Sequence, residues 1–149
     1  MPKAVNISGR QTPVHVHGDL VEADRLTLEQ LLSDGDALDR RCRAALLDPT
    51  LAGDDGSCGE GPTELYIRHH LSELDGLAGR LGVDDPASAD ATAIERFLAS
   101  MSVRSIWATP GSDRSFLHVD YTVDPDLTQY VLCVSFDRAG VVTSVDMES

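Results

Sequence analysis

Two histidines near the start of the chain have the spacing of a metal-binding pair. His15 and His17 are two residues apart in a predicted strand, so their side chains project from the same face. Imidazole is a common ligand of transition metals, and a predicted strand far along the chain carries His118 and Asp120 in the same alternation. These four residues are the candidate ligands of a divalent metal ion. The alternative is that the histidines face solvent, because the sequence does not show that the two strands are neighbours.

A second candidate site consists of acidic residues in a polar loop. Residues 49–62 contain four glycines and almost no apolar side chain, so they are predicted to form a flexible loop. Within this loop Asp54, Asp55 and Glu60 are candidates for contact with a partner.

The charge balance limits the classes of partner. The chain has 12 basic and 25 acidic residues, and its net charge is -13. This charge disfavours nucleic acid and anionic membranes as partners, and it attracts a basic protein. Solubility alone is the simpler explanation of the acidic surplus.

The sequence carries none of the common catalytic or cofactor motifs. It has no G-x-S-x-G nucleophile motif, no phosphate-binding loop and no dinucleotide fingerprint, so no cofactor is predicted beyond the divalent metal. Three widely spaced cysteines argue against a disulfide framework, and Cys42 and Cys133 are predicted to be small core residues. Without a signal peptide or a membrane-spanning segment, the protein is expected in the cytoplasm.

The pattern of apolar residues predicts one α+β domain over residues 1–149. Predicted strands cover residues 5–7, 14–16, 103–107, 116–123, 130–136 and 141–147, and predicted helices cover residues 27–46, 62–81 and 90–101. The first helix is expected to begin near Thr27 in a capping box with Gln30, and Gly35 is expected to split or weaken it. His70 falls on the apolar stripe of the second helix and is predicted to be a hydrogen-bonded core histidine.

Strands and helices are grouped along the sequence, which favours helices packed on an antiparallel sheet. We expect an N-terminal hairpin, turning at residues 9–13, and a C-terminal meander of three to four strands. About three helices should pack on one face of this sheet. An exposed edge strand would permit a dimer by strand pairing, so the protein is expected to be a monomer or a homodimer.

Three phrases of the sequence resemble a known prokaryotic family. They are, in this order, Leu65-Tyr-Ile-Arg-His-His-Leu-Ser-Glu-Leu74, Val119-Asp-Tyr-Thr-Val-Asp-Pro-Asp-Leu-Thr-Gln-Tyr-Val-Leu132 and Val145-Asp-Met-Glu-Ser149. Over residues 60–149 the chain is similar to the family named domain of unknown function two thousand and four. The resemblance implies a small soluble bacterial protein. The family has no assigned activity, so the resemblance carries over no catalytic residues.

Two functional hypotheses follow. The first is a small acidic binding protein without catalytic activity, inhibitor-like or immunity-like toward a basic protein. The second is a metal-binding protein or metal-dependent enzyme that uses His15, His17 and His118.

The strand prediction for residues 130–136 is directly testable. Leu132→Asp places a charge in the middle of the most apolar predicted strand, and we expect it to lower the free energy of unfolding by several kcal/mol. Thermal unfolding of the variant measures this loss. A variant that melts like the parent protein would show that this segment is not a buried strand.

Overall fold

The computed structural model describes residues 4–47, 66, 67, 69, 70, 91–110, 115–124, 126 and 128–148. Within this part of the chain it contains a six-stranded sheet and three helices, which confirms the α+β class. In chain order the elements are β1 (Ala4–Ile7), β2 (Arg10–Val16), α1 (Glu22–Leu31), α2 (Gly35–Leu46), α5 (Ala91–Ser100), β3 (Ser102–Ala108), β4 (Leu117–Thr122), β5 (Val131–Phe136) and β6 (Val142–Glu148).

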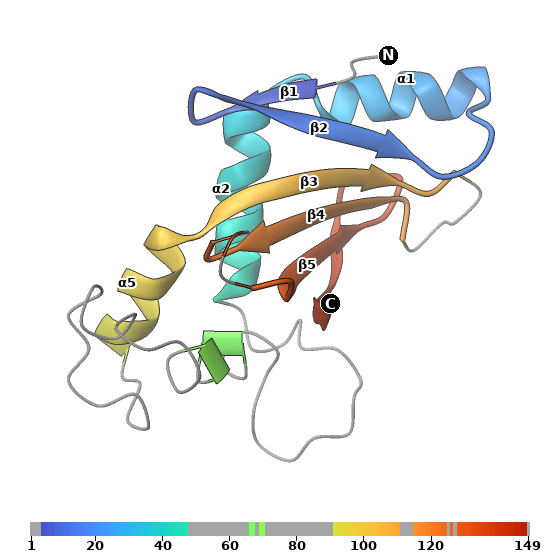
Figure 1. The fold of residues 1–149 in the computed structure, drawn as a ribbon. Helices are drawn as coiled ribbons and strands as arrows, with labels where there is room; N and C mark the ends of the chain where they lie inside the picture. Colours follow the sequence, from blue (N-terminus) through green and yellow to red (C-terminus); the bar gives the residue numbers. More distant parts are fainter. Residues whose placement is uncertain are drawn as a thin grey trace.

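The strands lie in the sheet in the same order as in the chain (Figure 1). The predicted N-terminal hairpin is confirmed as β1 and β2, and the predicted meander is confirmed as β3 to β6, with antiparallel neighbours throughout. The prediction of a purely antiparallel sheet is wrong, because β2 and β3 are parallel, with Val14 opposite Ile106. Parallel neighbours need a long crossover connection, and the helical region between the hairpin and the meander supplies it. The sheet is therefore mixed.

The hairpin turn is tighter than predicted. Ile7 pairs with Arg10, so only Ser8 and Gly9 form the turn, and both have positive φ angles, 51° and 81°. Two-residue hairpin loops of this kind match the twist of the strands. The prediction of a turn over residues 9–13 is therefore wrong, since residues 10–13 already belong to β2.

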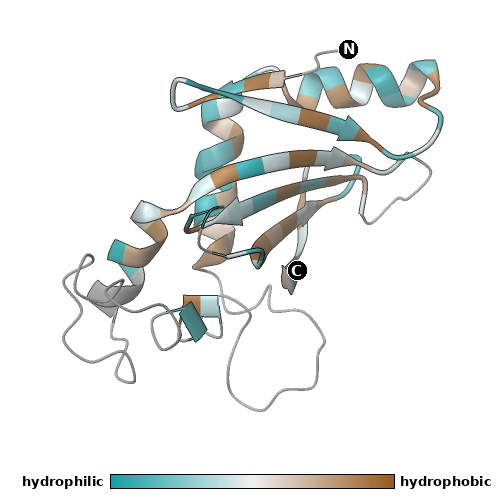
Figure 2. Cartoon of the chain, viewed as in Figure 1, coloured by the Kyte–Doolittle hydropathy of each residue, from teal (hydrophilic) through white to brown (hydrophobic). Residues whose placement is uncertain are grey.

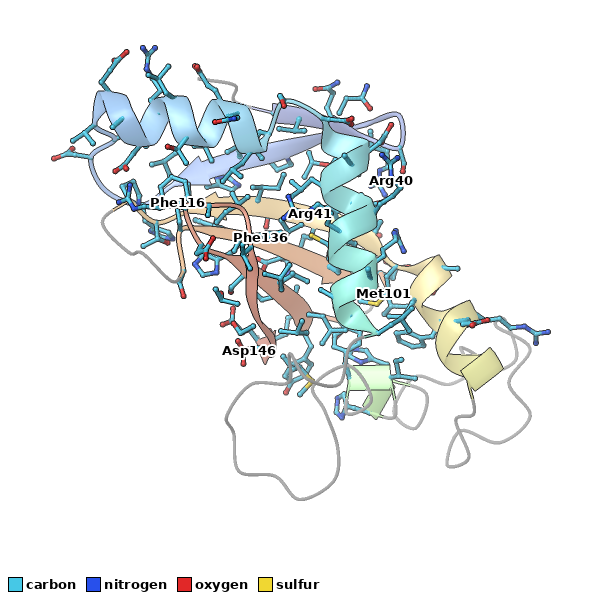
Figure 3. The ribbon with its side chains drawn as sticks, turned by 180° about the vertical axis from the view of Figure 1, so that it is seen from behind. Arg40, Arg41, Met101, Phe116, Phe136 and Asp146 are labelled. Carbon is cyan, nitrogen blue, oxygen red and sulfur yellow. The ribbon has the colours of Figure 1, made fainter. Side chains whose placement is uncertain are left out.

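Helices α1 and α2 cover one face of the sheet. Figure 3, which views the molecule from behind, shows both helices in front of the strands. Apolar and polar positions alternate along β2, β3 and β4 (Figure 2), so one set of side chains points toward these helices. A buried apolar row on this face runs across five strands through Val14, Ile106, Val119, Val134 and Val145. Leu132 is also fully buried, as the continuous apolar pattern of β5 predicts.

The first helix begins earlier than predicted. It starts at Glu22 after Val21, and no side chain caps it. Acidic residues in its first turn, Glu22 and Asp24, instead complement the helix dipole. The predicted capping box at Thr27 is not formed, because the Thr27 hydroxyl lies inside the helix and donates to the carbonyl of Ala23 at 3.0 Å.

The predicted break at Gly35 is confirmed. A new helix, α2, begins at Gly35, and the side chain of Asp34 caps it by accepting from the Ala37 N–H at 3.1 Å. Gly35 packs so closely on β1 that a Cβ atom there would lie 2.2 Å from the carbonyl oxygen of Asn6. The position therefore accepts only glycine unless α2 and β1 move apart.

Arg43 on α2 binds the C-terminal end of α5, the helix that precedes β3. Its guanidinium pairs with Asp39 at 3.1 Å and donates to the carbonyls of Leu98 and Met101, at 2.6 Å and 2.8 Å. Carbonyls at a helix C-terminus lack partners within the helix, and a cation there is favoured by the helix dipole. The Tyr121 hydroxyl on β4 donates to Asp39, so one polar cluster links α2, α5 and the sheet. Between Asp39 and Arg43 on α2, Arg41 lies over the ring of Phe136 (Figure 3).

Only four residues of the predicted helix over residues 62–81 are described. Among them Tyr66, Ile67 and His70 are buried. The ring nitrogens of His70 lie 2.7 Å from the carbonyl oxygen of Tyr66 and 2.9 Å from the Thr128 hydroxyl. The prediction of a hydrogen-bonded core histidine is confirmed. The predicted loop over residues 49–62, with Asp54, Asp55 and Glu60, lies outside the described residues. Among the described helices, none has the length and apolarity that crossing a membrane requires.

The close approach of α2 and β1 makes a testable prediction. Gly35→Ala is expected to lower the free energy of unfolding by about 1–3 kcal/mol, because the added methyl group meets backbone that cannot rotate away. Alanine is otherwise the better helix residue, so the sign of the change isolates the steric effect. Urea unfolding measures it, and a stabilised variant would contradict this packing.

Candidate functional site

The face of the sheet opposite α1 and α2 holds the histidine, acidic and cysteine side chains that could bind a ligand. We call it the open face, meaning the side of β2 to β6 opposite α1 and α2. It contains a cavity of about 690 Å³. The cavity is lined by Pro13, His15, His17, Arg104, Ser105, Trp107, Thr109, His118, Asp120, Gln129, Val131, Cys133 and Glu148.

The register of the strands brings the four predicted metal ligands to this one face. His15 lies opposite Trp107, Trp107 lies opposite His118, and His118 lies opposite Ser135. Directly opposite residues in a sheet point to the same side, so the parallel pairing of β2 with β3 places the two histidine strands in one site. Trp107 separates them. All four residues line one cavity, but the pair on β2 is not adjacent to the pair on β4.

His15 and His17 are stacked on the indole of Trp107. The ring centroids are 4.4 Å apart for His15 and 4.7 Å apart for His17, with interplanar angles of 29° and 17°. Among the described residues, the two histidines do not form a compact ligand group with His118. Metal binding by His15, His17 and His118 therefore stays a prediction.

Polar contacts connect the side chains of β3, β4 and β5 on the open face. The Trp107 indole N–H donates to the Ser105 hydroxyl at 3.0 Å, and this hydroxyl donates to the Asp120 carboxylate at 3.4 Å. His118 Nδ1 lies 2.9 Å from the Ser135 hydroxyl and 3.7 Å from Cys133 Sγ. The side chains around Asp120 and Cys133 are thus fixed by neighbours on three strands.

The most compact group of possible ligands differs from the predicted one. In the described part of the chain, one set of three or more such residues has its ligand atoms within 4.8 Å of one another, namely Asp120 on β4, Cys133 on β5 and Glu148 on β6. Asp120 was a candidate from the sequence. Cys133 was predicted to be a core residue, and it is buried as expected, yet it also lines the cavity. Glu148 gave no signal, because alternation within a strand does not reveal the register between strands.

The electrostatics of this group are unfavourable for its charged forms. Burial raises the pKa of Asp120 above its ordinary value. The pKa of Cys133 is raised by burial and by the negative charges of Asp120 and Glu148. Burial also raises the pKa of Glu148, as does the charge of Asp120 and Asp146. Three groups that can carry negative charge therefore meet at the edge of the cavity, one buried, one half-buried and one exposed. The charge of Arg104, in the same lining, acts to lower the pKa of Asp120, and a further cation would reduce the repulsion that remains.

Comparison of the chain with protein-family models, with curated proteins and with solved structures finds no match. The resemblance over residues 60–149 stays a prediction.

Ionisation of Asp120 should lower the free energy of unfolding at neutral pH. A carboxyl group whose pKa is raised by folding contributes full stability below its unfolded pKa, about 3.8, and that stability is lost as the pH rises through the folded pKa. Asp120→Asn removes the charge, so we expect the variant to be more stable than the parent protein at pH 7. The difference should shrink toward zero near pH 4.

Urea unfolding at both pH values tests this, with Asp19→Asn, an exposed carboxylate before α1, as the control for loss of one negative charge. A variant that is less stable than the parent protein at pH 7 would show that Asp120 serves the fold rather than a site.

Proposed function

We propose that the protein is a non-catalytic binding protein that recognises a basic protein, and that the cavity of the open face receives a lysine or arginine side chain of that partner. The observation that carries the proposal is the pairing of Asp120 and Glu148. Asp120 is half-buried and Glu148 is exposed, and the charge of each raises the pKa of the Cys133 thiol. A positively charged side chain would offset these negative charges on binding.

The charge of the whole chain supports the same conclusion. A net charge of -13 draws a basic partner toward the protein from a distance and speeds the encounter. Once the partner is close, the cavity provides a defined place for one cationic group. The concave shape and the fixed side chains of Ser105, Asp120 and His118 favour a specific contact over diffuse attraction.

The specific form of this proposal is an inhibitor-like or immunity-like role in the bacterial cytoplasm. A small acidic protein can block a basic enzyme or toxin by occupying its cationic surface. The lack of common nucleophile and cofactor motifs in the sequence supports a binding role over a catalytic one.

Trp107 makes the proposal measurable. It is the only tryptophan of the chain, and it lines the cavity. We expect hexaarginine amide to change the fluorescence of Trp107 in a saturable way at low ionic strength, and hexaglutamate to leave it unchanged. The double variant Asp120→Asn/Glu148→Gln should weaken hexaarginine binding by about tenfold or more, equivalent to about 1.4 kcal/mol.

The matched control removes the same charge elsewhere. The double variant Asp19→Asn/Glu22→Gln loses two exposed carboxylates at the start of α1, away from the cavity lining. It should bind hexaarginine nearly as well as the parent protein. Equal weakening by both double variants would mean that only overall charge attracts the peptide, and the proposed site would then be wrong.

A further inference from the structure

We propose that Asp120, Cys133 and Glu148 form a binding site for a thiophilic divalent cation such as Zn²⁺. The site differs from the histidine set that the sequence suggests, since it shares only Asp120 with it. It does not rest on the proposed recognition of a basic protein.

The distances suit a small ion. The three ligand atoms lie within 4.8 Å of one another, each on a different neighbouring strand. Ligands placed about 2.0–2.3 Å from a tetrahedral Zn²⁺ are about 3.3–3.8 Å apart, so binding requires the group to contract by about 1 Å. Glu148 is exposed at the end of the edge strand β6, and its side chain can move by this amount without disturbing the core.

The ligand types select the class of metal. A thiolate with two carboxylates suits Zn²⁺, Co²⁺ and similar transition metals. Ca²⁺ and Mg²⁺ take six or more oxygen ligands, and this group offers two carboxylates and a sulfur. The two lighter ions are therefore expected to bind poorly.

Neighbouring side chains already orient the ligands. His118 Nδ1 lies 3.7 Å from Cys133 Sγ, and Ser105 donates to Asp120. Such outer contacts usually fix the ligands of metal sites in proteins. Their presence distinguishes this group from an ordinary patch of surface acids.

The surroundings also favour a cation. Cys133 is 3% exposed, and the carboxylates of Asp120 and Glu148 lie within 4.8 Å of its sulfur. A bound cation offsets the repulsion among these groups. All three residues line the cavity, and three ligands would leave one position of a tetrahedral ion for water or a side chain of another molecule.

Co²⁺ provides the direct test, because a cobalt–thiolate bond gives a charge-transfer absorption that carboxylates and imidazoles do not give. Adding Co²⁺ to the reduced, metal-free protein should produce this band with one equivalent, and Zn²⁺ should abolish it by competition. Ca²⁺ and Mg²⁺ should not compete. Absence of the band in the folded protein would overturn the proposal.

Variants assign the ligands. Cys133→Ser should lose the band and weaken Zn²⁺ binding by at least about 100-fold, since loss of an outer contact alone costs about 10–100-fold. Glu148→Gln, at an exposed position, should weaken Zn²⁺ binding and keeps the test valid if Cys133→Ser does not fold. Cys58→Ser removes a thiol outside the described residues and should keep the band. If Cys58→Ser loses the band and Cys133→Ser keeps it, the proposed ligand is wrong.

The double variant His15→Ala/His17→Ala separates the two metal hypotheses. It should bind Co²⁺ as the parent protein does if Asp120, Cys133 and Glu148 hold the ion. Loss of Co²⁺ binding in this variant would transfer the site to the histidines.

Measuring Co²⁺ binding and hexaarginine binding on the same protein distinguishes the metal site from the proposed recognition of a basic protein. A bound Zn²⁺ engages both carboxylates that the hexaarginine peptide needs, so Zn²⁺ should weaken peptide binding if both proposals hold. Peptide binding without a cobalt–thiolate band overturns the metal site alone. A band without peptide binding overturns only the recognition of a basic protein.

Discussion

The parallel pairing of β2 with β3 determines the rest of the architecture. Parallel neighbours cannot be joined by a short turn, so the chain must leave the hairpin, cross one face of the sheet and return to start β3. Helices α1 and α2 lie on that crossover and cover this face (Figure 1), and their buried apolar residues include Leu28, Leu38 and Leu46. The polar residues of the same strands consequently gather on the other face. The separation of the sheet into a face covered by helices and an open polar face therefore follows from the parallel pairing of β2 with β3.

The two faces serve different needs. On the helix side, polar groups are paired in the interior, as in the cluster of Arg43, Asp39 and Tyr121 that joins three elements. On the open face, Asp120, Cys133 and Glu148 lie close together, and all three have raised pKa values although the charges of Arg104 and His118 act to lower that of Asp120. Natural proteins tolerate locally unfavourable electrostatics at functional sites. Here the apolar core between the sheet and the helices stabilises the fold.

The sequence predicts the elements better than their arrangement. Alternation in β4, the continuous apolar run of β5 and the Asp34-Gly35 break are local signals, and each corresponds to an element or boundary of the structure. The start of α1 was misplaced because charge in the first turn, rather than a capping side chain, favours it. The parallel pairing and the group containing Glu148 were missed because both depend on register between strands, and no pattern within a single strand encodes register.

The same pairing has a consequence for the order in which the chain acquires its structure. Val14 and Ile106 are partners in the sheet but lie roughly 90 residues apart, so at about 5–20 residues per second a ribosome makes one about 5–20 s before the other. During that interval the inner edge of β2 has no strand beside it, and an isolated two-stranded hairpin is only marginally stable in water. The meander from β3 to β6 has only short connections between neighbours and can assemble as soon as it emerges. We expect the edge of β2 to stay unpaired until β3 has been made, and during this time it is most open to pairing with a wrong strand.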